Sequence, residues 1–224
     1  NGNGCKMGAK PGENNMNSQL QHLLHNNPHI WLGNEAQPKG EGVTGLPTGY
    51  PSLDAILPER GWPKNALIEM VTPQWGFGEL QLLLPLMRSV TQQKRWMFWV
   101  CPPYIPYAPA LASAGVDINY LVTIDSKTTC KDAMWSVEKA LQSENCGLVM
   151  AWLDSLPNGV IRRLQLAATE GKTSGVLFRN YETKNSPAAL QLRLKHTGQG
   201  VHAHVTKSRG ANRYRSATIN LPFH

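Results

Sequence analysis

A loop with two glycines, Thr72–Leu80, is the first place in the sequence where the residue types suggest chemistry. It follows a predicted strand, Ala66–Val71, and opens a predicted helix. A phosphate-binding loop would read G-x-x-x-x-G-K-[ST], with backbone amides cradling phosphate and a lysine neutralising it. Here Gly78 or Glu79 stands at the lysine position, and Glu79 or Leu80 at the hydroxyl position. A carboxylate repels a triphosphate and no hydroxyl remains for magnesium, so the loop predicts a degenerate phosphate site.

The residues that mark this degenerate loop are Thr72, Trp75, Gly76, Gly78 and Glu79. The side chain of Trp75 either fills the space that a nucleotide needs or simply packs against the sheet, and the sequence leaves both open. We expect no cofactor and no catalytic residue. Residual ATP hydrolysis through an unusual loop is the enzymatic alternative.

Net charge points to a second kind of chemistry at the C-terminal end. The chain has a formal net charge of +7, yet residues 1–182 carry 15 basic and 15 acidic side chains. The last 42 residues carry no acid. Such an asymmetry indicates an anionic partner, either nucleic acid or an acidic protein surface. The alternative interpretation is a tail that only increases solubility. We expect the binding residues to be Lys207, Arg209, Arg213, Tyr214 and Arg215.

A proline-rich loop and a pair of arginines are further candidates for protein docking. Tyr104 and Tyr107 lie among four prolines, where a rigid aromatic loop is either a docking surface or an ordered lid. Arg162 and Arg163 begin a predicted helix and point about 100° apart on it. One can therefore be exposed while the other pairs locally, and a solvated face is the default interpretation.

The sequence gives little support to a zinc site or to disulfide bonds. His202 and His204 alternate along a predicted strand and share a face, but two ligands do not make a zinc site. The four cysteines form no C-x-x-C pair, so reduced thiols are expected. Most tryptophans are expected in the core or packed under loops; these are Trp62, Trp75, Trp96, Trp99, Trp135 and Trp152.

Strands that alternate with helices predict an α/β domain with a mainly parallel sheet. The expected helices are Leu53–Leu57, Glu79–Val90, Ala108–Ala114, Lys131–Ser143 and Gly159–Glu170. The expected strands are Ala66–Val71, Trp96–Cys101, Leu121–Ile124, Gly147–Leu153 and Gly175–Arg179. Leu190–Lys195 and Val201–Thr206 flank a T-G-Q-G turn and predict an antiparallel hairpin at the sheet edge, to which Arg213–Leu221 adds a third strand.

Length and composition suit one domain with an N-terminal extension. We expect residues 1–15 to be a tail, residues 16–44 to hold a helix and a linker, and residues 45–224 to form the α/β domain, with its basic end from about residue 184. No stretch approaches 18 consecutive apolar residues, and the Asn/Gly-rich start does not resemble a signal peptide. These features predict a cytoplasmic protein without a membrane span.

Three stretches resemble the core of the RecA recombinases: Thr48–Asp54 (T-G-x-x-S-L-D), Gly61–Glu69 (G-x-P-x-G-x-x-x-E) and Gly115–Leu121 (G-V-D-x-x-x-L). The resemblance implies a RecA-like three-layer fold. The acidic residue of the Walker B strand is displaced, since Trp152 stands near its place and Asp154 follows two residues later. Pro102 and Pro103 replace the acid that activates water. With the altered phosphate loop, these losses imply a RecA-like fold without ATPase activity.

A more specific resemblance is to ImuA, a RecA-like family of bacterial mutasome cassettes that support translesion DNA synthesis. The stretches that resemble it are Ile30–Gly33, Leu57–Pro63, Gly76–Pro85, Pro102–Leu111, Ile161–Ala168 and Ser186–Leu194. Leu32 stands where that family is expected to have arginine. The chain also resembles SulA, the SOS cell-division inhibitor family that binds FtsZ, over about residues 79–180. The stretches that carry this second resemblance are Leu82–Leu86, Gln92–Trp99 and Val149–Leu153.

The two resemblances imply different partners within the DNA-damage (SOS) response. The ImuA resemblance implies a non-catalytic accessory protein that contacts an ImuB-like protein, an error-prone polymerase or RecA, with single-stranded DNA as a further candidate ligand. The alternative is a SulA-like inhibitor that binds FtsZ and blocks its polymerisation. RecA-like domains polymerise edge to edge, so a homo-oligomer is a further expectation.

Overall fold

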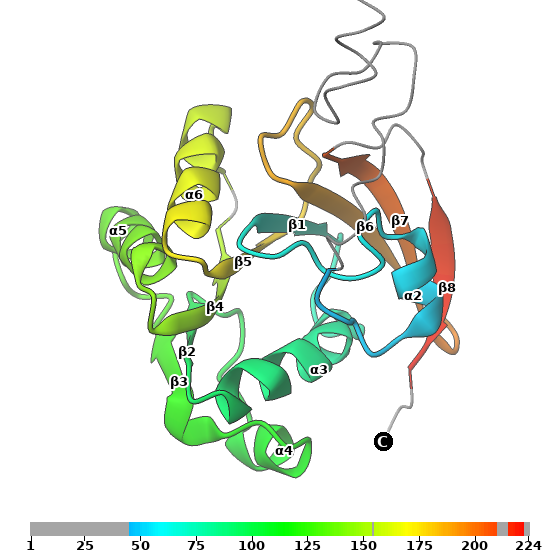
Figure 1. Ribbon diagram of the computed structural model, residues 1–224, viewed down its shortest axis with the longest axis horizontal. Coiled ribbons are helices and arrows are strands. Elements are labelled where there is room, and N and C mark those ends of the chain that lie inside the picture. The colour runs from blue at the N-terminus through cyan, green and yellow to red at the C-terminus, as the bar shows by residue number, and fades with distance from the viewer. Residues whose placement is uncertain (1–44, 154, 210–214, 222–224) are drawn as a thin grey trace, which may run out of the picture. The chain divides into compact units, whose positions relative to one another are not determined.

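The computed structural model describes residues 45–153, 155–209 and 215–221 as a mixed α/β unit around an eight-stranded sheet (Figure 1). The strands follow the order β3-β2-β4-β5-β1-β6-β7-β8. Pairs from β3 to β6 are parallel, whereas β6–β7 and β7–β8 are antiparallel. The strands are β1 (Leu67–Val71), β2 (Trp96–Val100), β3 (Leu121–Ile124), β4 (Cys146–Trp152), β5 (Ser174–Arg179), β6 (Leu190–Thr197), β7 (Gly200–Ser208) and β8 (Ser216–Asn220).

Helices lie on both faces of the parallel part of the sheet (Figure 1). One face is covered by α3 (Glu79–Gln92) and α4 (Ala108–Ser113), and the other by α5 (Cys130–Gln142) and α6 (Asn158–Glu170). The short helix α2 (Pro51–Ile56) lies beside β8, and one 3-10 turn spans Ile118–Tyr120. This arrangement follows from βαβ crossovers, which place helices on the faces of a parallel sheet.

The alternation of side chains along each strand divides the core in two. In β1, Ile68 and Met70 join the apolar cluster under α3, while Leu67 joins the cluster under α5 and α6. Every residue of β1, β4 and β5 except Trp152 is buried, because these strands have neighbours on both sides and helices on both faces. The antiparallel strands β6 and β7 instead alternate buried and solvated residues.

The predicted elements agree with the structure to within a few residues at their ends. The hairpin of β6 and β7 and the added strand β8 are confirmed, although β8 begins at Ser216 rather than Arg213. Gly115 takes the positive φ of 83° that is expected after α4. The described residues belong to one compact unit, and the expectations for residues 1–15 and 16–44 lie outside them.

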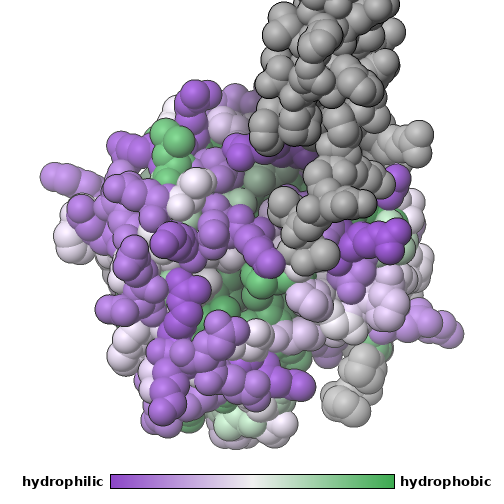
Figure 2. All heavy atoms as spheres, viewed as in Figure 1, coloured by the Kyte–Doolittle hydropathy of each residue, from purple (hydrophilic) through white to green (hydrophobic). Residues whose placement is uncertain are grey.

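Four of the six tryptophans expected in the core or under loops are buried or half-buried, but Trp96 and Trp135 are corrections. Trp135 on α5 is 61% exposed and Trp96 on β2 is 39% exposed, and both line the same surface concavity. Figure 2 shows that hydrophilic residues cover most of the face seen in Figure 1, with apolar residues reaching the surface near its middle. Among the described helices, none has the length and apolar character needed to cross a membrane.

Candidate functional site

The loops that follow β1, β2 and β4 meet at one edge of the sheet. These three strands are parallel members of one sheet, so their carboxyl ends point the same way. In open α/β sheets, ligands bind outside this edge. The degenerate phosphate loop follows β1, and the loop with Tyr104 and Tyr107 follows β2. The fold therefore brings together two of the segments that the sequence singled out.

The carboxylate of Glu79 accepts hydrogen bonds from two backbone amides of the loop that the sequence marked as a degenerate phosphate site. The amide of Gly76 donates to Oε1 of Glu79 at 2.6 Å, and the amide of Phe77 donates to Oε2 at 2.9 Å. Gly78 precedes α3 with a φ of 105°, which turns the chain so that Glu79 opens the helix. The Glu79 side chain is buried, and its negative charge at a helix N-terminus is favourable. The loop thus holds an anion of its own where a phosphate loop would hold a ligand.

The other marked residues of this loop make internal contacts. Thr72 donates from its hydroxyl to the carbonyl of Gln74 at 2.7 Å. Trp75 packs edge-on against Phe178, with 6.1 Å between the ring centroids. Phe178 stacks on Trp152 at 4.4 Å, and Trp152 lies 5.6 Å from Trp99. A row of aromatic rings therefore runs along the carboxyl edge of β5, β4 and β2. Trp75 packs against this row, which is the second of the two roles that the sequence left open for its side chain.

An apolar groove of about 230 Å³ lies between this aromatic row and the loop that follows β2. Its lining includes Leu80, Trp99 and Trp152 on one side, and the run Pro102–Tyr107 on the other. We call this run and the groove beneath it the aromatic surface. The sequence pattern pointed to Tyr104 and Tyr107 but not to Ile105, although an aliphatic residue in a proline-rich loop is itself a signal.

Three side chains of the aromatic surface are presented to solvent. Tyr104 is 69% exposed, Ile105 is 94% exposed and Tyr107 is 72% exposed. Three prolines in the run hold the backbone dihedral φ near one value, which limits the entropy that binding would cost. Tyrosine adds large contact area with few rotatable bonds. The arrangement suits protein docking better than small-molecule chemistry, because the described lining is mostly apolar and its one charged side chain, Glu79, already accepts hydrogen bonds from two backbone amides.

Arg162 and Arg163 lie on α6 and are not part of the aromatic surface. Both are exposed, and Nε of Arg163 forms an ion pair with Glu138 of α5 at 3.0 Å. This matches the expectation that one arginine pairs locally on a solvated helix face.

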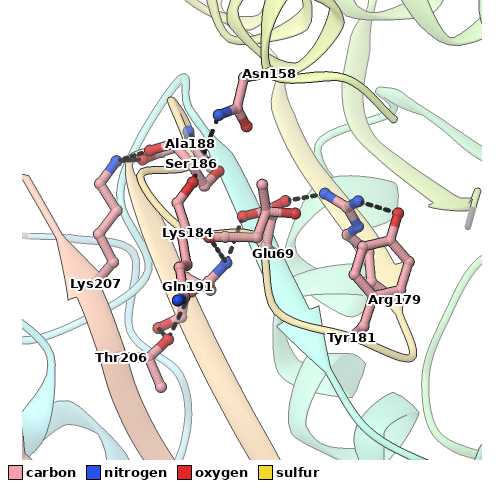
Figure 3. A network of polar contacts seen from close by, with 11 residues as sticks. Glu69, Asn158, Arg179, Tyr181, Lys184, Ser186, Ala188, Gln191, Thr206 and Lys207 are labelled. Atoms are coloured by element: carbon pink, nitrogen blue, oxygen red, sulfur yellow. Dashed lines mark hydrogen bonds and ion pairs between the residues drawn. The ribbon is translucent and has the colours of Figure 1, made fainter. Parts of the chain in front are cut away.

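The predicted basic cluster is only partly described, because Arg213 and Tyr214 lie outside the described residues. Lys207 donates from Nζ to the carbonyls of Ser186 (2.5 Å) and Ala188, as Figure 3 shows. Burial, and then the nearby charge of Arg209, lowers the pKa of Lys207. Its ammonium group therefore binds the loop before β6 instead of pointing into solvent.

The two other described members of that cluster contact different parts of the protein. Arg209 lines a shallow pocket with Glu59 and Lys64. Arg215 donates from Nη1 to the carbonyl of Ala55 in α2 at 3.4 Å. Burial raises the pKa of Glu59, while Lys64 and Arg209 counteract part of that rise. The described cations are thus distributed over several contacts and do not form one continuous stripe.

A buried polar network under the loop between β5 and β6 was missed by the sequence reasoning (Figure 3). Nη1 of Arg179 donates to Oε1 of Glu69 at 2.7 Å, and both side chains are fully buried. Nε2 of Gln191 donates to Oε2 of Glu69 at 2.9 Å. Nη2 of Arg179 donates to the hydroxyl of Tyr181 at 2.7 Å, and Thr206 donates to Gln191 at 2.8 Å. The sequence does carry a signal for this network, because the charged residues Glu69 and Arg179 stand in otherwise apolar strands.

His202 and His204 do share one face of β7, as expected. Among the described residues, no group of three or more histidine, cysteine, aspartate and glutamate side chains is placed to hold a metal ion.

The fold and this edge define a class: a mixed α/β protein in which the carboxylate of Glu79 closes the loop after β1, beside an exposed apolar surface. The family model described as "Cell division inhibitor SulA" matches residues 69–175. The SulA of Edwardsiella piscicida is 31% identical over 151 residues, which cover 62% of this chain and 88% of that protein. The chain therefore belongs to the SulA family of cell division inhibitors.

Two further relatives carry the same description. The SulA of Klebsiella aerogenes is 32% identical over 107 residues, covering 47% of this chain and 63% of the relative. The crystal structure of SulA from Pseudomonas aeruginosa is 23% identical, with a TM-score of 0.41, and covers 50% of this chain and 96% of that one. The family model and the two sequence relatives bear out the SulA resemblance, while the ImuA-specific resemblance gains no support from them.

Proposed function

We propose that this protein inhibits cell division by binding FtsZ through the aromatic surface. A subunit with a globular protein on one of its polymerisation faces cannot add the next subunit. Inhibition of this kind depends on the amount of inhibitor relative to FtsZ, and it requires no covalent chemistry by the inhibitor.

One observation carries the proposal: Ile105 is 94% exposed between two exposed tyrosines, directly over an apolar groove. Contiguous exposed apolar side chains of this kind mark interaction sites on soluble domains. Aromatic residues near the centre of an interface contribute a large share of binding energy. Trp99 and Trp152 line the same groove and are buried or half-buried, so a partner would pack against side chains that the fold already holds in place.

The occupied amides of Gly76 and Phe77 support a non-enzymatic role. A nucleotide phosphate would have to displace the carboxylate of Glu79, and no lysine in this loop would stabilise it afterwards. We infer that the scaffold is a RecA-like fold that has lost its ATPase site. The strand order, with β1 between β5 and β6, and the loop that opens α3 after β1 support this inference.

A second candidate is the ImuA-like accessory role in translesion synthesis, with an ImuB-like protein, an error-prone polymerase or RecA as partner. The observation that favours it is the position of the family match, which ends at residue 175, before β6, β7 and β8. These strands continue the same sheet and carry the basic end of the chain. In that role, the aromatic surface would bind a protein of the DNA-damage response.

The experiment is sedimentation of FtsZ polymer in the presence of GTP and increasing amounts of this protein. We expect the pelleted FtsZ to fall with dose, without any need for DNA and without ATP hydrolysis by the inhibitor. Unchanged polymer at several-fold excess would overturn the FtsZ proposal. Pull-down of purified RecA or an ImuB-like protein on the same immobilised chain would then favour the second candidate.

A further inference from the structure

The antiparallel end of the sheet carries a second surface, formed by β6 and β7. Leu192 and Leu194 of β6 point into the core with Ala203 of β7, so the intervening residues lie on the opposite face. Four of those residues are basic or titratable, and they line a shallow concavity of about 240 Å³. These four residues, which we call the basic face, are Arg193, Lys195, His202 and His204.

Strand register places these residues in two cross-strand pairs. Arg193 lies opposite His204, and Lys195 lies opposite His202. Residues directly opposite each other in an antiparallel pair have Cβ atoms about 4.5–5.5 Å apart. Successive residues on one face of a strand repeat about every 6.6–6.8 Å, which is two strand rises. The basic face is therefore a small grid of two cationic side chains and two imidazoles, with the repeat of an extended chain.

The contacts of these groups leave the face positively charged. Glu182, from the loop before β6, forms a two-point ion pair with Arg193, with 2.5 Å between Oε1 and Nε. From β8, the hydroxyl of Thr218 lies 3.1 Å from Nδ1 of His202. Lys195 is exposed, and within the described residues it has no ion-pair partner. Among the ion pairs of the described residues, Glu182 is the carboxylate bound to this face, which carries the permanent cations Arg193 and Lys195.

We propose that the basic face binds an extended acidic segment of a partner protein, with carboxylates at alternate positions. Alternate side chains of an extended peptide point the same way and repeat at the spacing of the strand beneath it. Its carboxylates can therefore meet Lys195 with His202, and then Arg193 with His204.

The residue types favour an acidic peptide over single-stranded nucleic acid. Proteins that bind single strands combine cations with aromatic side chains on which bases stack. The four residues that line the concavity include no phenylalanine, tyrosine or tryptophan. Imidazoles beside a lysine suit carboxylates, which need charge and hydrogen-bond donors but no stacking platform.

This surface is separate from the one proposed for FtsZ. The basic face lies on β6 and β7, beyond the residues 69–175 that the family model matches. In the sheet, β4, β5 and β1 separate it from β2, which leads into the aromatic surface. The inference therefore goes beyond the proposed function and does not depend on it.

The test is fluorescence anisotropy with the full chain and a labelled peptide of alternating glutamate and serine. We expect binding that weakens as salt rises. Lys195→Gln should weaken binding by about three- to fivefold. The matched control is Lys127→Gln, an exposed lysine on the loop after β3, which should change nothing.

Three outcomes would overturn the inference. The first is peptide binding that is indifferent to Lys195→Gln. The second is equal binding of a glutamine–serine peptide, which carries no charge. The third is tighter binding of an oligothymidine probe than of the peptide, with the same sensitivity to Lys195→Gln, which would assign the face to nucleic acid. FtsZ sedimentation with Lys195→Gln separates the two surfaces, because inhibition should persist when peptide binding falls.

Discussion

The carboxylate of Glu79 lies against the backbone amide of Gly76, with 2.6 Å between Oε1 and the amide nitrogen. Its second oxygen accepts from the amide of Phe77 at 2.9 Å. These amides are the groups that a phosphate-binding loop directs at its ligand. In this protein a side chain from the first turn of α3 supplies the negative charge, so the loop holds its shape without a bound ligand.

Glu79→Ala is expected to destabilise the protein by about 1–3 kcal/mol, because two part-buried amides lose their acceptor. Glu79→Gln should restore part of that loss, since its amide oxygen can accept one of the two bonds. Urea unfolding followed by circular dichroism measures both. Glu144→Ala, at an exposed carboxylate, is the control and should shift the free energy by less than about 0.5 kcal/mol. Equal losses for Glu79→Ala and Glu144→Ala would contradict the role assigned to the carboxylate.

The same site predicts the response to nucleotide. Magnesium ATP should leave the thermal midpoint of the unchanged protein where it is, because the carboxylate of Glu79 already occupies the amides. A ligand present at 100 times its dissociation constant would add about 2.7 kcal/mol of stability, which differential scanning fluorimetry detects easily. A clear rise in the midpoint with ATP, and none with adenosine, would show that the phosphate loop still binds its ligand.

The buried ion pair between Glu69 and Arg179 should matter far more than the exposed pair between Glu182 and Arg193. Glu69→Ala leaves a buried guanidinium without its carboxylate, and such changes cost about 3–5 kcal/mol. Glu182→Ala removes one partner of a partly exposed pair, which is worth about 1 kcal/mol or less. Urea unfolding of the two variants compares them directly. Similar losses would mean that the network in Figure 3 contributes little to stability.

Much of the fold was predictable because local patterns and long-range packing agree. Apolar strands such as Cys146–Trp152 are buried on both faces, and their nearly continuous run of apolar residues predicts this burial directly. The hairpin of β6 and β7 alternates apolar and polar residues with a period of two, which fixes both its strand character and its inner face. Element ends were less predictable, since they depend on caps and neighbours more than on pattern.

The site was only partly predictable, because it depends on which side chain finds which partner. The loop pattern predicted that Glu79 would exclude phosphate, but not that its carboxylate would accept the hydrogen bonds of Gly76 and Phe77. Lys207 was counted as a free cation from charge alone, whereas tertiary packing places its ammonium group on two backbone carbonyls. Trp135 was expected in the core, and only the packing of α5 reveals that it faces solvent.

Cysteine reactivity tests the burial of β4. Burial raises the pKa of the Cys146 thiol to about 12, and it also raises the pKa of Cys101, with Cys130 and Asp125 adding to the second effect. The thiolate is the reactive form. At about pH 8, iodoacetamide should therefore modify the exposed Cys130 quickly and leave Cys146 unmodified until the protein unfolds. Peptide mass mapping distinguishes these positions, and rapid labelling of Cys146 would contradict the structure.

Burial of Cys146 also makes the free energy of unfolding depend on pH. The unfolded thiol titrates near its ordinary pKa of about 8.5, well below the folded value for Cys146. Between the two values the folded protein binds more protons, so its stability falls as pH rises. The contribution is fully present below the unfolded pKa and is lost as pH climbs towards about 12. Cys146→Ala should flatten the alkaline part of the stability curve measured by urea unfolding.

The most direct prediction concerns the aromatic surface. Ile105→Ser should leave folding unchanged, because the side chain is 94% exposed, yet it should raise the concentration needed for half-inhibition of FtsZ polymerisation by about tenfold. Tyr107→Ser should act in the same direction. The matched control is Leu166→Ser, a 60% exposed leucine on α6, which should retain full inhibition. If Leu166→Ser loses inhibition and Ile105→Ser keeps it, the docking surface lies on the α5–α6 face, because the two variants remove similar apolar area and differ in where it is removed.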